Sequence, residues 1–301
     1  MRPPALLGIY RERVFSPGKM EDDAAIMDAA LEELAGMGWE VAALPAESLT
    51  SSSPRPEYVL TMAQSDVALN ILEDWCRQGT RAINSVSSIR SCYRKPLTRI
   101  LSEAGIGIPP SRMVRLENVE AELSGYSRAR FWLKRGDVHA MEAGDVVSVA
   151  SKEELDGALV HFFGRDMRDI LIQEHVEGPV VKFYGVGEGE YFRAYMAGNG
   201  DEVTSEVGLL GKIARQAAGA VGLGVYGGDA VLTDTSGPVL IDLNDWPSFS
   251  RCRCSAGRSI AAFARAELQG KGGLDSPMVI RTKYPEAARG ERTIPASCSS
   301  R

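Results

Sequence analysis

In the first part of the chain, short apolar runs alternate with stretches in which apolar residues recur every three or four positions. The runs are typical of strands, and the stretches are typical of amphipathic helices. Together they predict strand 5–10, helix 21–36, strand 40–44, strand 58–62, helix 65–77 and strand 81–84. This order is typical of a small parallel sheet with helices on its faces.

A turn at residues 16–20 follows the first predicted strand. Open parallel sheets bind ligands at the carboxyl ends of their strands, so this turn is a candidate for ligand binding. Its Lys19 would then bind an anionic group of a substrate. A solvated lysine in an exposed loop is the simpler interpretation of the same residue.

After residue 90 the patterns predict more helices and strands. In chain order they are helix 93–104, strands 131–134 and 145–149, a short helix from 152, strands 170–173, 180–186 and 190–195, and helix 209–221. Two last strand-like stretches, 225–232 and 239–249, flank a turn in which Gly237 tolerates a positive φ, and this predicts a hairpin. From about residue 271 the sequence has no periodicity, which predicts a poorly ordered tail.

Polar residues interrupt the second strand of this hairpin at regular spacing. Alternate residues of a strand share a face, so Asp242 and Asn244 point the same way, and the hairpin can bring Asp229 beside them. Two carboxylates and an amide oxygen are ligands that suit Mg²⁺. Mg²⁺ keeps its other positions for water and the phosphates of a nucleotide. The hairpin therefore predicts a magnesium site.

The alternative is that the polar residues only close an edge strand before the turn at Pro247. Ile241 and Leu243 alternate with the polar pair, which predicts one buried face and one polar face. This alternation favours the metal site over the simple end of a strand.

The composition indicates a soluble globular enzyme long enough for two or three packed units, with 301 residues, 44% of them hydrophobic. The net charge of −6 argues against nucleic acid as the main partner. No apolar run approaches the ~20 residues of a membrane span, and no signal-peptide core follows the first residues, so we expect a cytoplasmic protein without membrane association. Five scattered cysteines indicate reduced thiols, and the close pair Cys252 and Cys254 is a weak metal candidate.

The chain has no glycine fingerprint of the Rossmann or P-loop type. Nucleotide phosphates would have to be held by lysines and a mobile loop. Lys134 ends an apolar strand, where an unpaired buried charge would cost several kcal/mol, so a functional role is favoured over a surface role. Lys95 lies in a more polar segment, where the two interpretations are equally supported.

The order of these motifs, from about Ser85 to Phe249, resembles the ATP-grasp enzymes. The resemblance implies an α/β (α+β) fold, in which two αβ units grip ATP between them. It implies an N-terminal pre-ATP-grasp domain at 1–88 and an ATP-grasp domain at 89–270, with 112–176 as the smaller nucleotide-gripping subdomain and 271–301 as the tail.

The same resemblance assigns the nucleotide site. It implies that Lys95 and Lys134 contact the phosphates of ATP, and that Asp229, Asp242 and Asn244 bind Mg²⁺, with Mn²⁺ as a substitute. The segment 173–177 would be the hinge beside the adenine and ribose. Its residues are Gln173, Glu174, His175, Val176 and Glu177, the last of which would accept hydrogen bonds from the ribose hydroxyls.

Three residues are implied in catalysis. His139, in the loop 135–141, resembles the loop histidine of the ATP-grasp inositol-phosphate kinases, and Lys182 would lie near the transferred phosphate. Arg193 would hold an anionic substrate, although a surface-facing arginine on a strand is as well supported. The chain departs from the kinase branch at 194–197, where that branch has a further arginine.

ATP-grasp ligases activate a carboxylate as an acyl phosphate, whereas the kinases phosphorylate a hydroxyl group. A polyphosphorylated acceptor needs a dense basic cleft, and the N-terminal unit offers only dispersed cations. We therefore favour a ligase of the glutathione synthetase-like kind that acts on a small molecule or a peptide. The kinase is the alternative, a non-catalytic nucleotide-binding protein is a third possibility, and the oligomeric state stays open.

Overall fold

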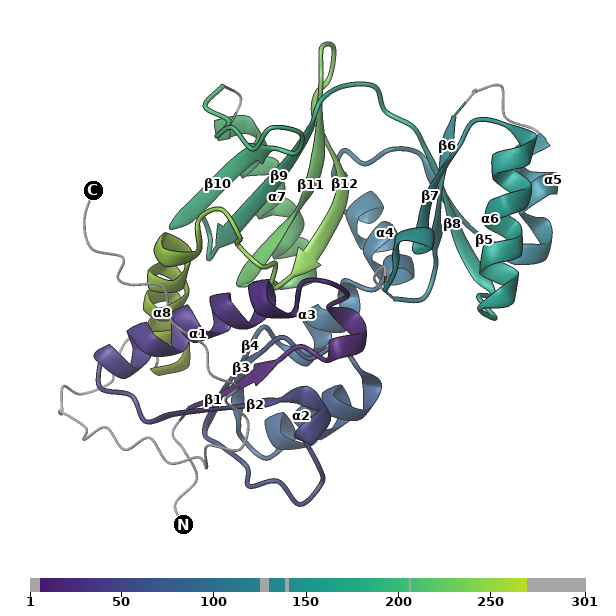
Figure 1. The fold of residues 1–301 in the computed structure, drawn as a ribbon. Helices are drawn as coiled ribbons and strands as arrows, with labels where there is room; N and C mark the ends of the chain where they lie inside the picture. Colours follow the sequence, from purple (N-terminus) through teal and green to yellow (C-terminus); the bar gives the residue numbers. More distant parts are fainter. Residues whose placement is uncertain (1–5, 125–129, 139–140, 206, 270–301) are drawn as a thin grey trace.

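The computed structural model describes residues 6–124, 130–138, 141–205 and 207–269. These residues form three four-stranded sheets with helices packed on them (Figure 1). One sheet is parallel and two are antiparallel, which confirms the predicted α/β (α+β) class. In this part of the chain no helix is long and apolar enough to cross a membrane. The predicted tail at 271–301 lies outside the described residues.

The first sheet is parallel and has the strand order β2-β1-β3-β4. Its strands are β1 (Leu6–Tyr10), β2 (Val41–Pro45), β3 (Tyr58–Thr61) and β4 (Arg81–Ile83). One face packs against α1 (Met20–Gly36) and α8 (Arg253–Gln269), and the other face packs against α2 (Asp66–Arg77) and α3 (Val86–Ser91). The last helix of the described chain therefore packs beside the first (Figure 1).

The second sheet is antiparallel and has the order β5-β8-β6-β7. Its strands are β5 (Ser111–Arg115), β6 (Phe131–Arg135), β7 (Val146–Val149) and β8 (Asp169–Glu174). The helices α5 (Val119–Ser124) and α6 (Lys152–Gly164) cover one face, on which Leu133 and Ile172 are buried. Because side chains alternate along a strand, Lys134 and the other residues of its parity lie on the opposite face.

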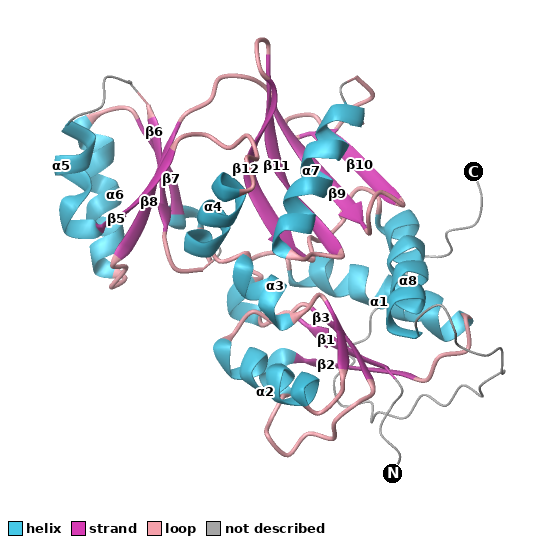
Figure 2. Cartoon of the chain, turned by 180° about the vertical axis from the view of Figure 1, so that it is seen from behind, coloured by secondary structure: helices cyan, strands magenta, loops and turns pink. Residues whose placement is uncertain are grey.

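The third sheet is antiparallel and has the order β10-β9-β11-β12. Its strands are β9 (Val180–Val186), β10 (Tyr191–Met196), β11 (Val225–Thr233) and β12 (Gly237–Asp245). The helices α7 (Val207–Val221) and α4 (Arg94–Glu103) pack against one face, where Phe183 and Leu243 are buried (Figure 2). The opposite face is polar around Lys182 and Asp229, and further along Tyr184, Val186 and Val225 pack on it against α8.

The predicted strands and long helices are present, with differences at their ends. The final strand stops at Asp245 rather than at Phe249, because Trp246 and Phe249 have φ angles of 42° and 48°, which end a strand. Sequence patterns missed β5, α3 and α5. They also missed four short 3₁₀ turns, η1 (Arg13–Phe15), η2 (Ala46–Ser48), η3 (Leu116–Asn118) and η4 (Ala143–Asp145).

The cysteines only partly match the expectation of reduced thiols. Cys76, Cys92 and Cys252 are free. Cys254 is disulfide-bonded, so the expectation is wrong for that residue. Among the described residues, Cys252 and Cys254 belong to no cluster with the geometry of a metal site.

Candidate active site

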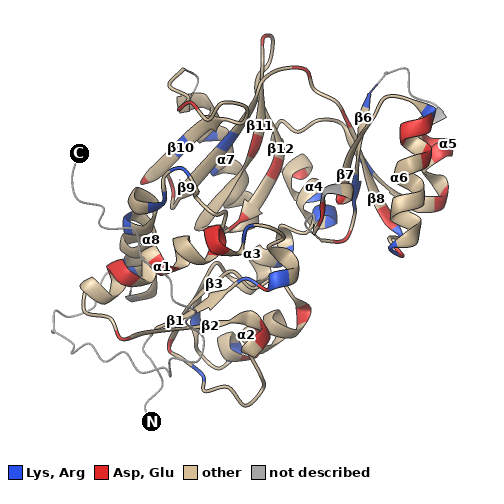
Figure 3. Cartoon of the chain, in the orientation of Figure 1, with Lys and Arg blue, Asp and Glu red and all other residues tan. Residues whose placement is uncertain are grey.

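A row of charged side chains crosses the polar face of the third sheet. Lys182 on β9 is opposite Asp229 on β11, and Asp229 is in turn opposite Asp242 on β12. Asn244 lies two residues after Asp242 and therefore shares its face. The predicted trio of Asp229, Asp242 and Asn244 is thus brought together by strand register. Acidic positions on both strands of the hairpin are visible in Figure 3.

Close contacts hold this row together. Lys182 Nζ donates to Asp229 Oδ1 at 2.8 Å, and Asn244 Nδ2 lies 3.4 Å from Asp242 Oδ2. Burial raises the pKa of Asp229 and outweighs the opposing effect of Lys182. Burial alone would lower the pKa of Lys182, but the Asp229 carboxylate raises it above its usual value. Two half-buried carboxylates therefore lie on facing strands of this sheet, where cationic side chains contact them.

The chemistry of this donor set fits Mg²⁺. Asp229 and Asp242 supply carboxylate oxygens from facing strands, and their side chains are each 25% exposed, so solvent reaches both. Turning the Asn244 amide by 180° would replace Nδ2 with Oδ1 and add a third oxygen. These three residues are therefore able to hold the ion.

A bulge in β12 brings Lys134 to the same place. The pairing of β11 with β12 shifts between Asp229 and Ala230, so Ile241 is opposite no residue of β11. The carbonyl of Ile241 accepts a hydrogen bond of 3.0 Å from Lys134 Nζ, which comes from the second sheet. The bulge also reverses the alternation, so Leu240 rather than Ile241 enters the core, contrary to the predicted pattern.

The surroundings of Lys134 change its acidity. Lys134 is buried, with 5% of the residue exposed. Burial is the main cause that lowers the pKa of Lys134 to about 8, and Arg94 adds to it, while Asp242 and Asp229 oppose it. Lys134 therefore lies close enough to Asp242 and Asp229 to respond to their charge.

Arg94 is a functional candidate that the sequence analysis missed. Its residue is 6% exposed, and its Nη1 lies 3.5 Å from Asp242 Oδ1. The neighbouring Lys95 is exposed on α4, so its predicted contact with ATP stays a prediction. The helical spacing could have indicated that Arg94 is buried. Arg94 precedes the buried Leu97 and Leu101 by three and seven positions and so shares their face of the helix.

A pocket lies between α4, β8 and β12 beside these cations. Its lining mixes apolar and polar residues, and it includes Arg94, Leu171, Gln173, Ile241 and Asp242. An apolar pocket with a few convergent polar groups is typical of a small-molecule site. The pocket lies between the second and third sheets, next to Asp242.

The predicted hinge, 173–177, begins on β8 and continues beyond its end. Gln173 is buried, and its Nε2 donates to Ser111 Oγ at 3.1 Å. Glu174 and Val176 are half-buried. Their predicted contacts with a nucleotide stay predictions.

A chain of hydrogen bonds orders the side chains in the second half of the hinge. Trp132 Nε1 donates to His175 Nδ1 at 3.1 Å, and His175 Nε2 lies 3.1 Å from Glu177 Oε1. A histidine that accepts at Nδ1 can donate only from Nε2, so this arrangement selects one neutral tautomer. Glu177 is thereby oriented, although its side chain is 88% exposed.

Arg193 shares the polar face of the third sheet. It is opposite Tyr184, two positions along β9 from Lys182. Its Nε lies 3.3 Å from Glu202 Oε1, and its guanidinium carbon lies 5.4 Å from the centre of the Tyr191 ring. The structure therefore places Arg193 near Lys182 and gives it an ion pair with Glu202.

Comparisons with known proteins identify this architecture. No family model matches the sequence, and no characterised protein matches it significantly in sequence. The RimK domain ATP-grasp protein from Sphaerobacter thermophilus DSM 20745 matches with a TM-score of 0.70 at 18% identity, over 87% of this chain and all of its own. VanG D-Ala:D-Ser ligase from Enterococcus faecalis matches with a TM-score of 0.68 at 14% identity, over 89% of this chain and all of its own.

A third match is the ATP-grasp ligase PsnB, solved with the precursor peptide PsnA2 and AMPPNP. Its TM-score is 0.58 at 16% identity, over 87% of this chain and 96% of its own. The chain has the ATP-grasp fold. The resemblance stated from the sequence is therefore confirmed at the level of the fold.

The loop 135–141, which the resemblance implied would cover the phosphates, follows β6. Arg135 Nη1 donates to Asp145 Oδ2 at 2.9 Å, and the Met141 amide donates to the same oxygen at 2.7 Å. Burial alone would raise the pKa of Asp145, but these hydrogen bonds lower it below its usual value. They fix both ends of the loop, while His139 lies outside the described residues.

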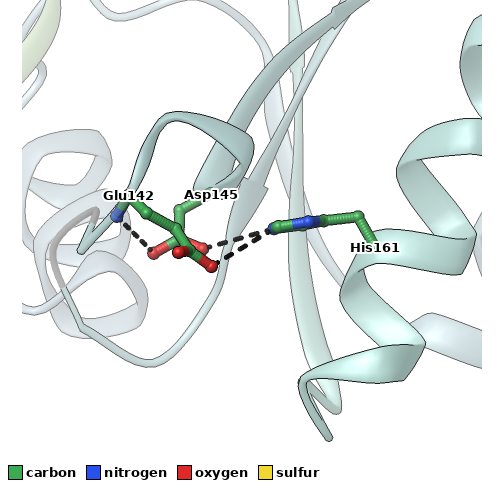
Figure 4. A group of neighbouring side chains, drawn as sticks. All are labelled: Glu142, Asp145 and His161. Atoms are coloured by element: carbon green, nitrogen blue, oxygen red, sulfur yellow. Dashed lines mark hydrogen bonds and ion pairs between the residues drawn. The ribbon is translucent and has the colours of Figure 1, made fainter.

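A second group of possible metal ligands lies beside this loop. Glu142, Asp145 and His161 bring their ligand atoms within 4.8 Å of one another (Figure 4). Asp145 already pairs with Arg135, and Arg165 pairs with both Asp145 and Glu142. Because two guanidinium groups already balance two carboxylates, this group fits an ion-pair network better than a metal site.

Proposed function

We propose that this chain is a Mg²⁺-ATP-dependent ligase that joins a carboxylate to an amine through an acyl phosphate. The observation that supports it best is the convergence on Asp242 of cations from separate elements. Arg94 comes from α4, Lys134 comes from the second sheet, and the row with Lys182 comes from the third sheet. Such a grouping suits a polyphosphate whose charge must be neutralised during transfer.

Asp229, Asp242 and Asn244 would hold Mg²⁺, for which Mn²⁺ could substitute because it accepts the same oxygen ligands. The ion supplies neutralisation of charge on the phosphates. Lys134 and Arg94 would contact those phosphates beside Asp242. Lys182 would then be next to the transferred group, because it already lies 2.8 Å from Asp229.

The nucleotide base would enter the pocket between the two antiparallel sheets. Backbone groups at Glu174 and Val176 would meet the adenine edge, with Gln173 beside it and the ribose hydroxyls donating to Glu177. His175 would orient Glu177 rather than contact the base, given their 3.1 Å contact.

The acceptor would lie over the polar face of the third sheet, towards Arg193 and Lys19. Arg193 shares the face of the metal ligands, and its cationic side chain would hold an anionic group of a small molecule or peptide. His139 would cover the transferred phosphate from the loop, and Lys95 would add positive charge at the entrance.

The proposed chemistry has two steps. A carboxylate oxygen of the acceptor attacks the γ-phosphorus, and the bond to the β-phosphate oxygen breaks to release ADP. The nitrogen of an amine then attacks the acyl carbon, phosphate leaves, and the nitrogen loses a proton to give an amide. The support for this class over a kinase is that VanG and PsnB are named as ligases.

The test is a screen of amino acids, short peptides and polyols for ADP release, followed by the addition of hydroxylamine. Hydroxylamine converts an acyl phosphate into a hydroxamate and does not react in this way with a phosphate ester. We expect a hydroxamate that depends on ATP, Mg²⁺ and the acceptor. Asp242→Asn should remove it while leaving the protein folded, because it removes one charge from the metal site.

Two outcomes would contradict the proposal. A stable phosphomonoester without hydroxamate would make the chain a kinase. Full ATP-dependent turnover in Asp242→Asn would show that the metal residues are assigned wrongly.

A further inference from the structure

The strand that carries two of the three metal ligands lies at an edge of its sheet. In the described part of the chain, β12 pairs with β11 on one side and with no other strand. The bulge at Ile241 also interrupts its ladder next to Asp242. An edge strand with a broken ladder is held less firmly than a central one, so contacts beyond its sheet matter for where its side chains lie.

The end of β12 is held by the N-terminal sheet. Asp245, the residue after Asn244, is 1% exposed, and both of its carboxylate oxygens accept from Gln64 Nε2, at 2.8 and 2.9 Å. Gln64 is 3% exposed, and its Oε1 is buried without a partner among the described residues. The side-chain amide of Gln64 therefore makes its hydrogen bonds to Asp245.

A second contact holds the backbone at the same point. Arg11 Nη2 donates to the carbonyl oxygens of Asp245 and Trp246, at 3.2 and 2.7 Å. Trp246 is fully buried and has a φ of 42°, a conformation that costs a non-glycine residue about 1 kcal/mol or more and persists only where its surroundings impose it. Arg11 contributes directly to that constraint.

Both anchors are themselves fixed at the carboxyl edge of the first sheet. Arg11 follows β1, and Gln64 follows the neighbouring strand β3. The Glu12 carboxylate accepts hydrogen bonds from the backbone N–H of Gln64 at 2.9 Å and of Ser65 at 3.0 Å. Tyr93 Oη donates to the backbone carbonyl of Gln64 at 2.6 Å. The two side chains therefore extend from a rigid support towards β12.

We propose that Gln64 and Arg11 are positioning residues for the metal site. They fix the end of β12 and thereby set Asn244 and Asp242 against Asp229 on the facing strand. The inference rests on the proposed function, because it concerns the Mg²⁺ that the three residues would hold. Loss of either anchor should weaken the coupling between Mg²⁺ and nucleotide, with little effect on nucleotide binding in the absence of metal.

An isosteric exchange separates positioning from simple structural support. Gln64→Glu puts two carboxylates in contact in a buried place, whereas the double variant Gln64→Glu with Asp245→Asn restores an amide facing a carboxylate with the same number of heavy atoms. The measurement is the affinity for AMPPNP by calorimetry with and without Mg²⁺. The ratio of the two affinities reports the metal coupling. Gln78→Glu, at an exposed position on the same unit, is the matched control.

We expect Gln64→Glu to lower this ratio about tenfold, which is about 1.4 kcal/mol of coupling, with metal-free affinity unchanged within about twofold. The double variant should recover the ratio, and Gln78→Glu should match the wild type. If Gln64→Glu does not fold, Arg11→Lys serves in its place, since lysine keeps the positive charge but lacks the planar guanidinium whose Nη2 donates to both carbonyls while Nη1 faces Asp23, and a smaller loss is expected.

The outcomes separate this inference from the proposed function. A wild-type protein whose AMPPNP affinity does not rise with Mg²⁺ would contradict the proposed function itself. A wild-type rise that Gln64→Glu and Arg11→Lys both retain would overturn only the positioning role. Equal losses in the single and double exchange variants would also overturn it, because restored pairing should restore the ratio.

Discussion

Burial gives Lys134 a chemistry that a surface lysine lacks. In the free protein its pKa is lowered to about 8, mainly by burial, so the ammonium group is partly deprotonated near that pH. A bound polyphosphate stabilises the charged form and raises the pKa again. As pH rises through about 8 the free protein loses this charge, so ATP affinity should fall. ATP binding near that pH should also take up a proton, measurable by calorimetry in buffers of different ionisation enthalpy.

Lys134→Met should abolish the proton uptake and weaken ATP binding, because it keeps the apolar stem and removes the ammonium group. Lys95→Met is the matched control, since Lys95 is an exposed lysine that is not part of this buried group. It should retain the uptake. Equal proton uptake in Lys134→Met and the wild type would assign the linkage to another residue.

Some residues of the candidate site could be predicted from the sequence, and others could not. The period of two in a strand was enough to predict that Asp242 and Asn244 share a face and that Asp229 lies beside them. The buried Arg94 was missed although helical spacing puts it on the face of Leu97 and Leu101, because charged residues are usually solvated. Its role depends on Asp242, which is distant in sequence and which no local pattern links to α4.

The two strands of the β11–β12 hairpin approach each other closely at Gly228. A Cβ atom on Gly228 would lie 2.2 Å from the Asp242 carbonyl oxygen and 2.8 Å from the Phe183 ring. Gly228→Ala should therefore push β12 away, lower the free energy of unfolding by about 1–3 kcal/mol and weaken the Mg²⁺-dependent part of AMPPNP binding. Denaturant unfolding and calorimetry measure the two effects.

Gly219→Ala is the control for this change. Gly219 lies within α7, and a Cβ atom there would meet nothing within 4 Å. Alanine should be neutral or should stabilise the helix by about 0.5–1 kcal/mol. A Gly228→Ala protein as stable as Gly219→Ala would mean that the close approach to Asp242 is not required.

The bulge in the same hairpin could not be predicted from the hydrophobic pattern. Simple alternation predicted Ile241 and Leu243 on the buried face, but the structure buries Leu240 and Leu243 and leaves the Ile241 carbonyl for Lys134. A bulge adds one residue on one strand only, and the local sequence of Leu240, Ile241 and Asp242 is as compatible with a regular strand. The bulge depends on contacts with another sheet.

At the scale of the whole molecule, β12 and the residue after it receive hydrogen bonds from side chains beside both of the other sheets. The parallel sheet contributes Gln64 and Arg11, and the second sheet contributes Lys134. The strand and helix order predicted the parallel sheet, the β11–β12 hairpin and all but one of the other strands. Hydrophobic period defines the face that an element buries, but it does not define which sheet lies next to which. For that reason Gln64 and Arg11 received no role from the sequence.

This arrangement predicts how the molecule responds to a nucleotide. Mg²⁺ and AMPPNP bound between Lys134 and the Asp229–Asp242 row would connect the second and third sheets. Hydrogen exchange should then slow in β6 and in the β11–β12 hairpin together, because opening either sheet would break contacts with the same ligand. Without Mg²⁺ the hairpin should gain less protection than β6. In Lys134→Met with Mg²⁺ the order should reverse, since the metal contacts remain on the hairpin. Protection confined to one sheet under all three conditions would show that the nucleotide does not bind between them.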